Sequence, residues 1–323
     1  MPRAAVLLAV AAVALAAHRA SGQNPPISTA LDAATRTAVV SEVAATIRER
    51  YADRAVGDSL AATLTRNLEA GRYDSIASLD GLAAAVMAVI RSRVADRHFN
   101  FVVVQERTGT GQAAPRQPSR NGLGAVRMLQ DGVAYVEMDA MPGDSVSQRV
   151  VREALAALPE VRAVVLDLRW NVGGSAAMVR LLCSHFLDAG ELLYRVRAGS
   201  GSQPSEARAE PQPRRFGPEV PVYILTADGT HSAAEAFAYI LRDYGRATLV
   251  GEATPGMANP SRSYPISGGF RLTVPFQLFL YGRSGTTYAG VGLVPDLAAP
   301  PDSALDAALA DIRRRAAGAG RQE

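Results

Sequence analysis

Two short, largely apolar runs most constrain what this chain can fold into. Each run is followed by a glycine-containing turn and a helical pattern. Residues 222–226 are β-branched and apolar, and residues 163–169 form a similar run. Strands of this composition are buried on both faces, as happens when helices cover both sides of a sheet. Because strands alternate with helices from about Gly124 to the C-terminus, the sequence predicts an α/β domain.

Ser232 lies where the turn after residues 222–226 passes into a predicted helix. A hydroxyl at a helix N-terminus sits at the positive end of the helix dipole, beside backbone N–H groups that can hold a developing oxyanion. Ser232 and Glu235 also have the spacing of a capping box, in which the serine only satisfies a backbone N–H. The stretch therefore fits a nucleophile and a cap alike.

A glycine pair closes the other apolar run. Residues 163–169 end in Trp170-Asn-Val-Gly-Gly174, which leads into a predicted helix at 176–187. Glycines after a buried strand allow close backbone approach, and their N–H groups can face a ligand or an oxyanion. A tight turn that serves packing is the alternative.

The N-terminal part has a different pattern. Three helical stretches predict a small α-helical region at residues 28–104. The spacing of the apolar residues changes from that of a helix to that of a strand at residues 96–104. His98 lies at this junction, where a neutral imidazole could act as a base near pH 7, although a lone histidine is often structural. Residues 105–121 are a predicted linker, and residues 122–323 are the predicted core.

The first 22 residues have the pattern of a secretory signal peptide, with basic Arg3 before an apolar run at 4–17. This run is shorter than the roughly 20 residues that span a bilayer. We therefore expect cleavage and a secreted or periplasmic protein with no membrane partner.

Loss of Arg3 and Arg19 would lower the formal net charge from +3 to +1, which does not indicate a nucleic-acid partner. Cys183 is the only cysteine, and the scattered histidines predict no metal site and no cofactor.

Four ordered motifs together resemble the tail-specific (carboxyl-terminal processing) serine protease superfamily. They are Leu166-Asp-Leu-Arg169 with Asn171-Val-Gly-Gly174, Thr230-His-Ser-Ala-Ala-Glu235, Gly245-Arg-Ala-Thr-Leu-Val-Gly-Glu252 with Thr254 and Gly256, and Gly292-Leu-Val-Pro-Asp296. The chain is most similar to the branch that contains the interphotoreceptor retinoid-binding protein modules and the tricorn core protease. The resemblance implies a crotonase-like (ClpP/crotonase) ββα core. The segment between Val104 and Gly124 is too short for the PDZ domain that processing proteases insert, so none is expected.

The same resemblance implies site residues. Ser232 would be the nucleophile, and the backbone N–H groups of Gly174 and Ala233 would form the oxyanion hole. The lysine that acts as base in the processing proteases is replaced here by Met257. His98 instead matches the histidine that the tricorn-like branch uses.

One supporting residue departs from the pattern. The tricorn-like branch commonly places a glutamate that supports the histidine at a position occupied here by Ala289. A histidine without an orienting carboxylate can be held in the wrong tautomer, which is costly in serine hydrolases. Asp96 and Asp296 are the two carboxylates that could replace it.

The leading hypothesis is a serine-type peptidase that hydrolyses peptide bonds of peptides or unfolded proteins, with Ser232 as nucleophile and His98 as base. A second hypothesis is a non-catalytic module that binds an apolar small molecule or peptide in the same cleft. An esterase that uses the same serine is a third. The sequence predicts no oligomeric state.

Overall fold

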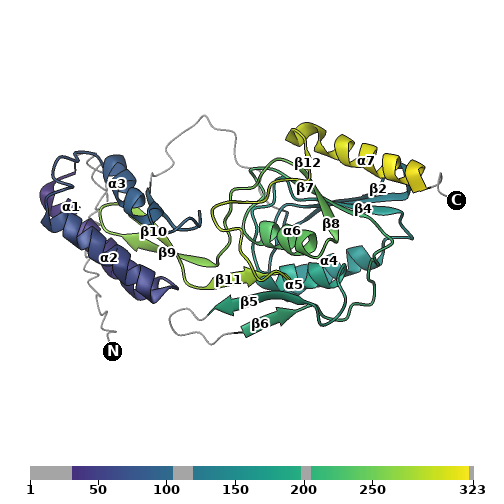
Figure 1. The fold of residues 1–323 in the computed structure, drawn as a ribbon, viewed down its shortest axis with the longest axis horizontal. Coiled ribbons are helices and arrows are strands. Elements are labelled where there is room, and N and C mark those ends of the chain that lie inside the picture. Colours follow the sequence, from purple (N-terminus) through teal and green to yellow (C-terminus); the bar gives the residue numbers. More distant parts are fainter. Residues whose placement is uncertain (1–30, 105–118, 198–204, 320–323) are drawn as a thin grey trace, which may run out of the picture.

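The centre of the molecule is a six-stranded sheet with the order β12-β8-β7-β4-β3-β2. Figure 1 shows it in a computed structural model that describes residues 31–104, 119–197 and 205–319. Strands β3, β4, β7, β8 and β12 run parallel, and β2 pairs antiparallel with β3. The strands are β2 (Leu123–Met128), β3 (Val133–Met138), β4 (Ala163–Asp167), β7 (Val222–Thr226), β8 (Ala247–Gly251) and β12 (Leu297–Ala298).

Helices cover both faces of this sheet, which confirms the predicted α/β core. The helices are α4 (Ser145–Ala156), α5 (Ala176–Ser184), α6 (Ala233–Asp243) and α7 (Ala304–Ala319), with short 3-10 turns at Gln130–Gly132 and Pro301–Ser303. Val164 and Leu166 of β4 pack in the core that includes α4, α5 and α6, whereas Val165 packs in the core that includes α7. Since both faces are buried, β4 and β7 need apolar residues at successive positions, as the sequence has them.

A second part of the molecule lies at the opposite end from α7 (Figure 1). It contains α1 (Ala33–Arg50), α2 (Arg54–Glu69), α3 (Leu79–Arg91) and a sheet of order β1-β10-β9, with β1 (Asn100–Val103), β9 (Ser261–Ile266) and β10 (Phe270–Pro275). Phe101 of β1 stacks on Phe270 of β10 with ring centroids 4.8 Å apart. Burying a side chain of this size stabilises a fold by about 1.5–3 kcal/mol.

This second part changes the expected division of the chain. The three helices predicted at residues 28–104 are present, but their apolar core is shared with β9 and β10 from residues 261–275. A boundary at residue 122 therefore does not separate two independent cores. The predicted signal peptide at 1–22 and most of the predicted linker at 105–121 lie outside the described residues.

A third sheet, of order β11-β5-β6, lies along the side of α5 (Figure 1). Its strands are β5 (Leu192–Arg197), β6 (Ser205–Arg208) and β11 (Leu278–Tyr281). Phe279 of β11 stacks on Tyr194 of β5 at 4.8 Å between centroids. These aromatic rings form one wall of the pocket described below.

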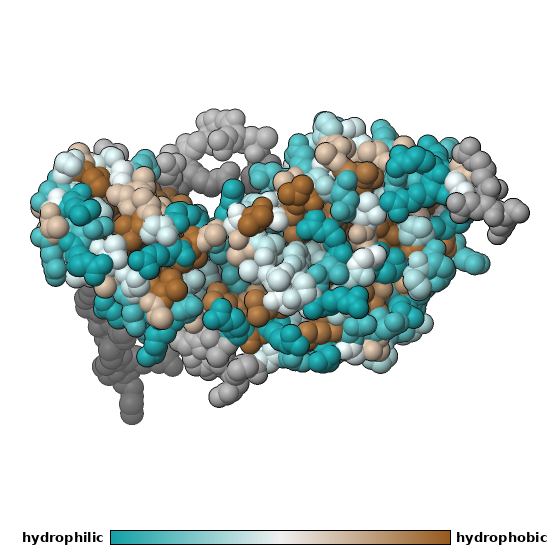
Figure 2. All heavy atoms as spheres, viewed as in Figure 1, coloured by the Kyte–Doolittle hydropathy of each residue, from teal (hydrophilic) through white to brown (hydrophobic). Residues whose placement is uncertain are grey.

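The face shown in Figure 2 is mainly polar, with small separate apolar areas rather than one continuous band. Within the described ranges, none of the helices combines the length and the apolar composition needed to cross a bilayer.

Candidate active site

Ser232 occupies a strained position at the start of α6. Its backbone angles are φ 54° and ψ −114°, in the region that normally requires glycine. A residue held in such a conformation costs about 1–3 kcal/mol and persists only where its surroundings impose it. The Tyr288 hydroxyl, which is almost fully buried, donates to the Ser232 carbonyl at 3.2 Å.

Glu235 connects Ser232 to the following loop. Its carboxylate is fully buried and accepts the Ser232 N–H at 2.9 Å and the Met257 N–H at 2.9 Å through Oε2. Oε1 accepts the Thr254 hydroxyl at 2.6 Å and the Gly256 N–H at 2.7 Å. Burial raises the pKa of Glu235, and these four hydrogen bonds act against that rise. The carboxylate thus holds the start of α6 and residues 254–257 in one arrangement.

The glycine pair after β4 packs against Ser232. A Cβ at Gly173 would lie 2.6 Å from the His231 carbonyl oxygen and 2.8 Å from Ser232 Cβ. Gly174 has φ 149°, and a Cβ there would lie 2.2 Å from the Met141 carbonyl oxygen. Only glycine allows the backbone to approach this closely.

Asn171 fixes this glycine loop. Its Nδ2 donates to the Met138 carbonyl and its Oδ1 accepts the Gly173 N–H, both at 2.9 Å. Its own carbonyl accepts the His231 N–H at 2.9 Å. Through these bonds, one buried amide aligns the two loops that follow β4 and β7.

The backbone N–H groups of Gly174 and Ala233 belong to residues that line one pocket. Within the described part of the chain, neither donates a hydrogen bond to a protein acceptor. Both residues line the pocket together with Ser232, and its volume is about 220 Å³. The remaining lining is mostly apolar and aromatic: Ala176, Val179, Tyr194, Ala236, Ala258, Pro260, Gln277, Phe279 and Tyr281. Two free amides beside a hydroxyl can stabilise an oxyanion formed there.

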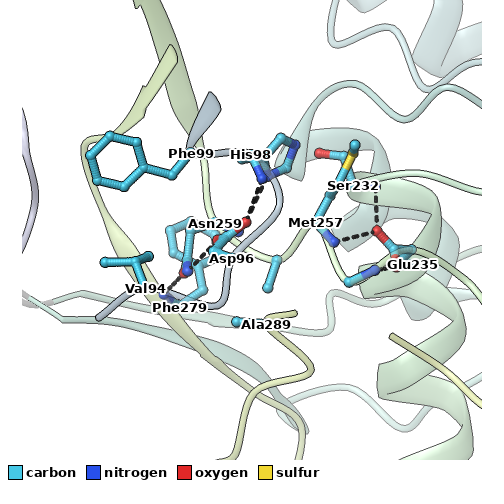
Figure 3. A network of polar contacts seen from close by, with 12 residues as sticks. Val94, Asp96, His98, Phe99, Ser232, Glu235, Met257, Asn259, Phe279 and Ala289 are labelled. Carbon is cyan, nitrogen blue, oxygen red and sulfur yellow. Dashed lines mark hydrogen bonds and ion pairs between the residues drawn. The ribbon is translucent and has the colours of Figure 1, made fainter. Parts of the chain in front are cut away.

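His98 reaches this site from the segment between α3 and β1. Figure 3 shows the Ser232 hydroxyl and the His98 imidazole directed toward each other. The His98 side chain is 16% exposed, and its Nδ1 lies 3.6 Å from Asp96 Oδ1. Burial lowers the pKa of His98, and the Asp96 charge acts in the opposite direction. A neutral imidazole in this position can accept a proton from a hydroxyl.

The sequence-predicted residues Ser232, Gly174 and Ala233 therefore surround one pocket, with His98 beside Ser232. Three residues that hold them were not predicted as site residues: Asn171, Asn259 and Tyr288. Apart from the bond between Asn171 and Gly173, their contacts are hydrogen bonds between segments distant in the chain, which leave no periodic signal in the sequence. In the ranges that the structure describes, no group of three His, Cys, Asp or Glu side chains is placed to hold a metal ion.

The sequence model of peptidase family S41 matches residues 132–299, which is more than half of the chain. The chain belongs to peptidase family S41.

Curated relatives include the Carboxy-terminal-processing protease of Bartonella bacilliformis, 29% identical over 154 residues, covering 46% of this chain and 34% of that protein. The chloroplastic Carboxyl-terminal-processing peptidase 2 of Arabidopsis thaliana is 29% identical over 232 residues, covering 69% and 42%. A probable CtpA-like serine protease of Staphylococcus epidermidis is 26% identical over 137 residues, covering 42% and 27%. The aligned regions span well under half the length of these curated relatives.

Solved structures of a putative peptidase and of a protease share the fold. A putative peptidase from Parabacteroides merdae has a TM-score of 0.60 at 18% identity and covers 87% of this chain and 97% of its own. The tricorn protease has a TM-score of 0.52 at 12% identity, covering 87% of this chain and 37% of its own. At these identities the likeness shows the fold alone.

Proposed function

We propose that this S41 family member is a serine-type peptidase in which Ser232 attacks the peptide carbonyl and His98 is the base. The observation that carries the proposal is the strained Ser232, which lines one pocket with Gly174 and Ala233 and whose hydroxyl is directed toward the His98 imidazole. Strain of this kind is maintained at functional sites because the surroundings over-determine the conformation.

The reaction follows from this arrangement. The Ser232 Oγ–H bond breaks as its proton moves to His98 Nε2, and Oγ bonds to the substrate carbonyl carbon. The N–H groups of Gly174 and Ala233 donate to the resulting oxyanion. His98 then returns the proton to the leaving nitrogen as the C–N bond breaks, and water hydrolyses the acyl-enzyme by the same steps.

The proposed substrates are peptides or unfolded proteins. The pocket beside Ser232 is lined chiefly by apolar side chains such as Val179, Ala236 and Phe279, which suit an apolar substrate side chain. The antiparallel β2-β3 pair ahead of the parallel strands supports a crotonase-like ββα core. The short distance along the chain between β1 and β2 supports the absence of an inserted PDZ domain, and the pattern of residues 1–22 supports a secreted or periplasmic location.

Degradation of casein by the mature chain tests the proposal. We expect Ser232→Ala and His98→Ala to lower kcat by about 10⁴-fold or more, because the nucleophile and base act as one unit. Ser263→Ala is the matched control: Ser263 is exposed on β9, and its hydroxyl forms a hydrogen bond with the Thr273 hydroxyl. The proposal is wrong if Ser232→Ala retains the hydrolytic rate of the unmodified protein.

A further inference from the structure

Of the two carboxylates that the sequence offers as support for His98, Asp296 is engaged elsewhere in the fold. Ala289 carries no polar side-chain atom. Asp296 is committed to the central sheet, where its Oδ2 accepts the Leu249 N–H at 2.7 Å and its own N–H donates to the Leu249 carbonyl at 2.9 Å. Asp96 remains, two residues before His98.

Asp96 is held rigidly from both sides. Its side chain is 2% exposed, and Oδ2 accepts both the backbone N–H of Asn259 at 2.9 Å and the Asn259 Nδ2 amide at 2.6 Å. Oδ1 accepts the backbone N–H of His98 at 2.8 Å. Asn259 is itself fixed, because its Oδ1 accepts the Phe279 N–H at 2.8 Å. A carboxylate with this many donors has no freedom to turn away from the imidazole.

His98 Nδ1 needs an acceptor that Asp96 can supply. Nδ1 is buried and has no hydrogen-bond partner among the described residues, and Asp96 Oδ1 lies 3.6 Å from it. Buried N–H groups are nearly always paired, so a small shift that closes this gap is favourable. Figure 3 shows the imidazole ring between Asp96 and Ser232. With its proton on Nδ1, the ring presents the Nε2 lone pair to the hydroxyl.

We propose that Asp96, clamped by Asn259, is the positioning residue for His98 and takes the place of the glutamate replaced here by Ala289. The inference rests on the proposed function of His98 as base. Asp96 sets the Nδ1–H tautomer and keeps its negative charge beside the imidazolium that forms when Ser232 loses its proton. It does not itself take up the proton, which moves only between Ser232, His98 and the leaving nitrogen.

Steady-state kinetics of Asp96→Asn give the first test. We expect kcat to fall at least about 100-fold with KM nearly unchanged, because the wrong tautomer is favoured. Removing the carboxylate charge also lowers the pKa of His98, so the acid limb of kcat/KM should move about one unit toward lower pH. Asp296→Asn is the matched control: it removes an equal charge elsewhere and should leave the acid limb where it is. An Asp96→Asn acid limb at the pH of the unmodified protein would overturn the proposal.

Nitrogen-15 NMR of the His98 ring, recorded in a Ser232→Ala protein, gives a second test that needs no catalysis. We expect the proton on Nδ1 when Asp96 is present, and a shift toward the Nε2–H tautomer in Ser232→Ala/Asp96→Asn. A ring that carries its proton on Nε2 with Asp96 intact contradicts the proposal, even if Asp96→Asn fails to fold.

The two tests separate the inference from the proposed function. Hydrolysis retained by Ser232→Ala refutes the assignment of the nucleophile, while the NMR spectrum still decides whether Asp96 orients His98. Conversely, loss of hydrolysis in Ser232→Ala and His98→Ala together with normal activity in Asp96→Asn leaves the peptidase assignment standing and refutes the inference.

Discussion

Buried hydrogen bonds, rather than the intrinsic backbone preferences of the residues, hold single residues at this site in place. The strain at Ser232, about 1–3 kcal/mol, is maintained by the Glu235 carboxylate on its N–H and the Tyr288 hydroxyl on its carbonyl. Capping and nucleophilic roles are therefore compatible at Ser232, because Glu235 supplies the reciprocal capping contact while the hydroxyl faces His98.

The pH dependence of hydrolysis tests the environment of His98. Burial lowers the pKa of His98 below its ordinary value of about 6.5, so the imidazole stays neutral and competent as a base to a lower pH than an ordinary histidine does. We expect the acid limb of kcat/KM for the unmodified protein to be centred below about 6.5. An acid limb centred above that pH would show that the Asp96 charge outweighs burial.

The sequence could predict features within one strand-turn-helix segment of the site, but not the contacts that join segments far apart in the chain. Strand, turn and helix patterns place Ser232 and Ala233 at a helix start and Gly174 after a buried strand, whereas the oxyanion-hole roles of Gly174 and Ala233 were implied by the family resemblance. The contact between Asp96 and Asn259 joins residues 163 positions apart, through one carboxylate and one amide. No periodicity records such a pair.

At the scale of elements, the pocket is formed where α5 and α6 meet the β5-β11 pair. Strand β6 shows why one of these strands is hard to predict from sequence. The four residues of β6 carry only one buried side chain, Ala207, so their sequence has no apolar alternation. Pairing with β5 forms this strand, and pairing partners far along the chain are not visible in a local window.

A substitution on α6 tests the pocket. Ala236 is buried in its lining, and Ala236→Leu would fill part of the 220 Å³ space. For peptides that differ only at the residue before the scissile bond, we expect the Phe-to-Ala ratio of kcat/KM to fall at least about tenfold, since one or two methylene-sized contacts are worth 1–3 kcal/mol.

The Phe-to-Ala ratio of kcat/KM does not depend on the folded fraction of the variant, because both peptides are assayed with the same protein sample. Ala156→Leu, at an exposed position at the end of α4, is the control and should leave the ratio unchanged. An unchanged ratio in Ala236→Leu would mean that another surface binds this side chain.

At the scale of the whole molecule, the two ends of the fold depend on each other. Helices α1–α3 share one core with β9 and β10, which extend from the larger part (Figure 1). Residues 261–275 leave and re-enter that part at almost the same point, because the Phe276 N–H donates to the Pro260 carbonyl at 3.0 Å. The N-terminal helices therefore cover apolar strands that would otherwise face water.

Truncation tests this dependence. We expect residues 122–323 alone to aggregate, because Phe270, Leu272 and Val274 lose their apolar partners, whereas residues 31–323 should elute as a folded species in size-exclusion chromatography. A 122–323 chain in which a short Gly-Ser linker replaces residues 261–275 is the matched control and should regain solubility. A soluble, cooperatively folding 122–323 chain with residues 261–275 intact would contradict the shared core.

The distance of 163 positions between Asp96 and Asn259 also has a consequence during translation. The ribosome releases the segment that carries His98 first, Ser232 much later, and Asn259 later still. Contacts of such long range form late in folding, because loop closure must precede them. A nascent chain thus has no assembled Asp96–Asn259 contact until most of it has been made.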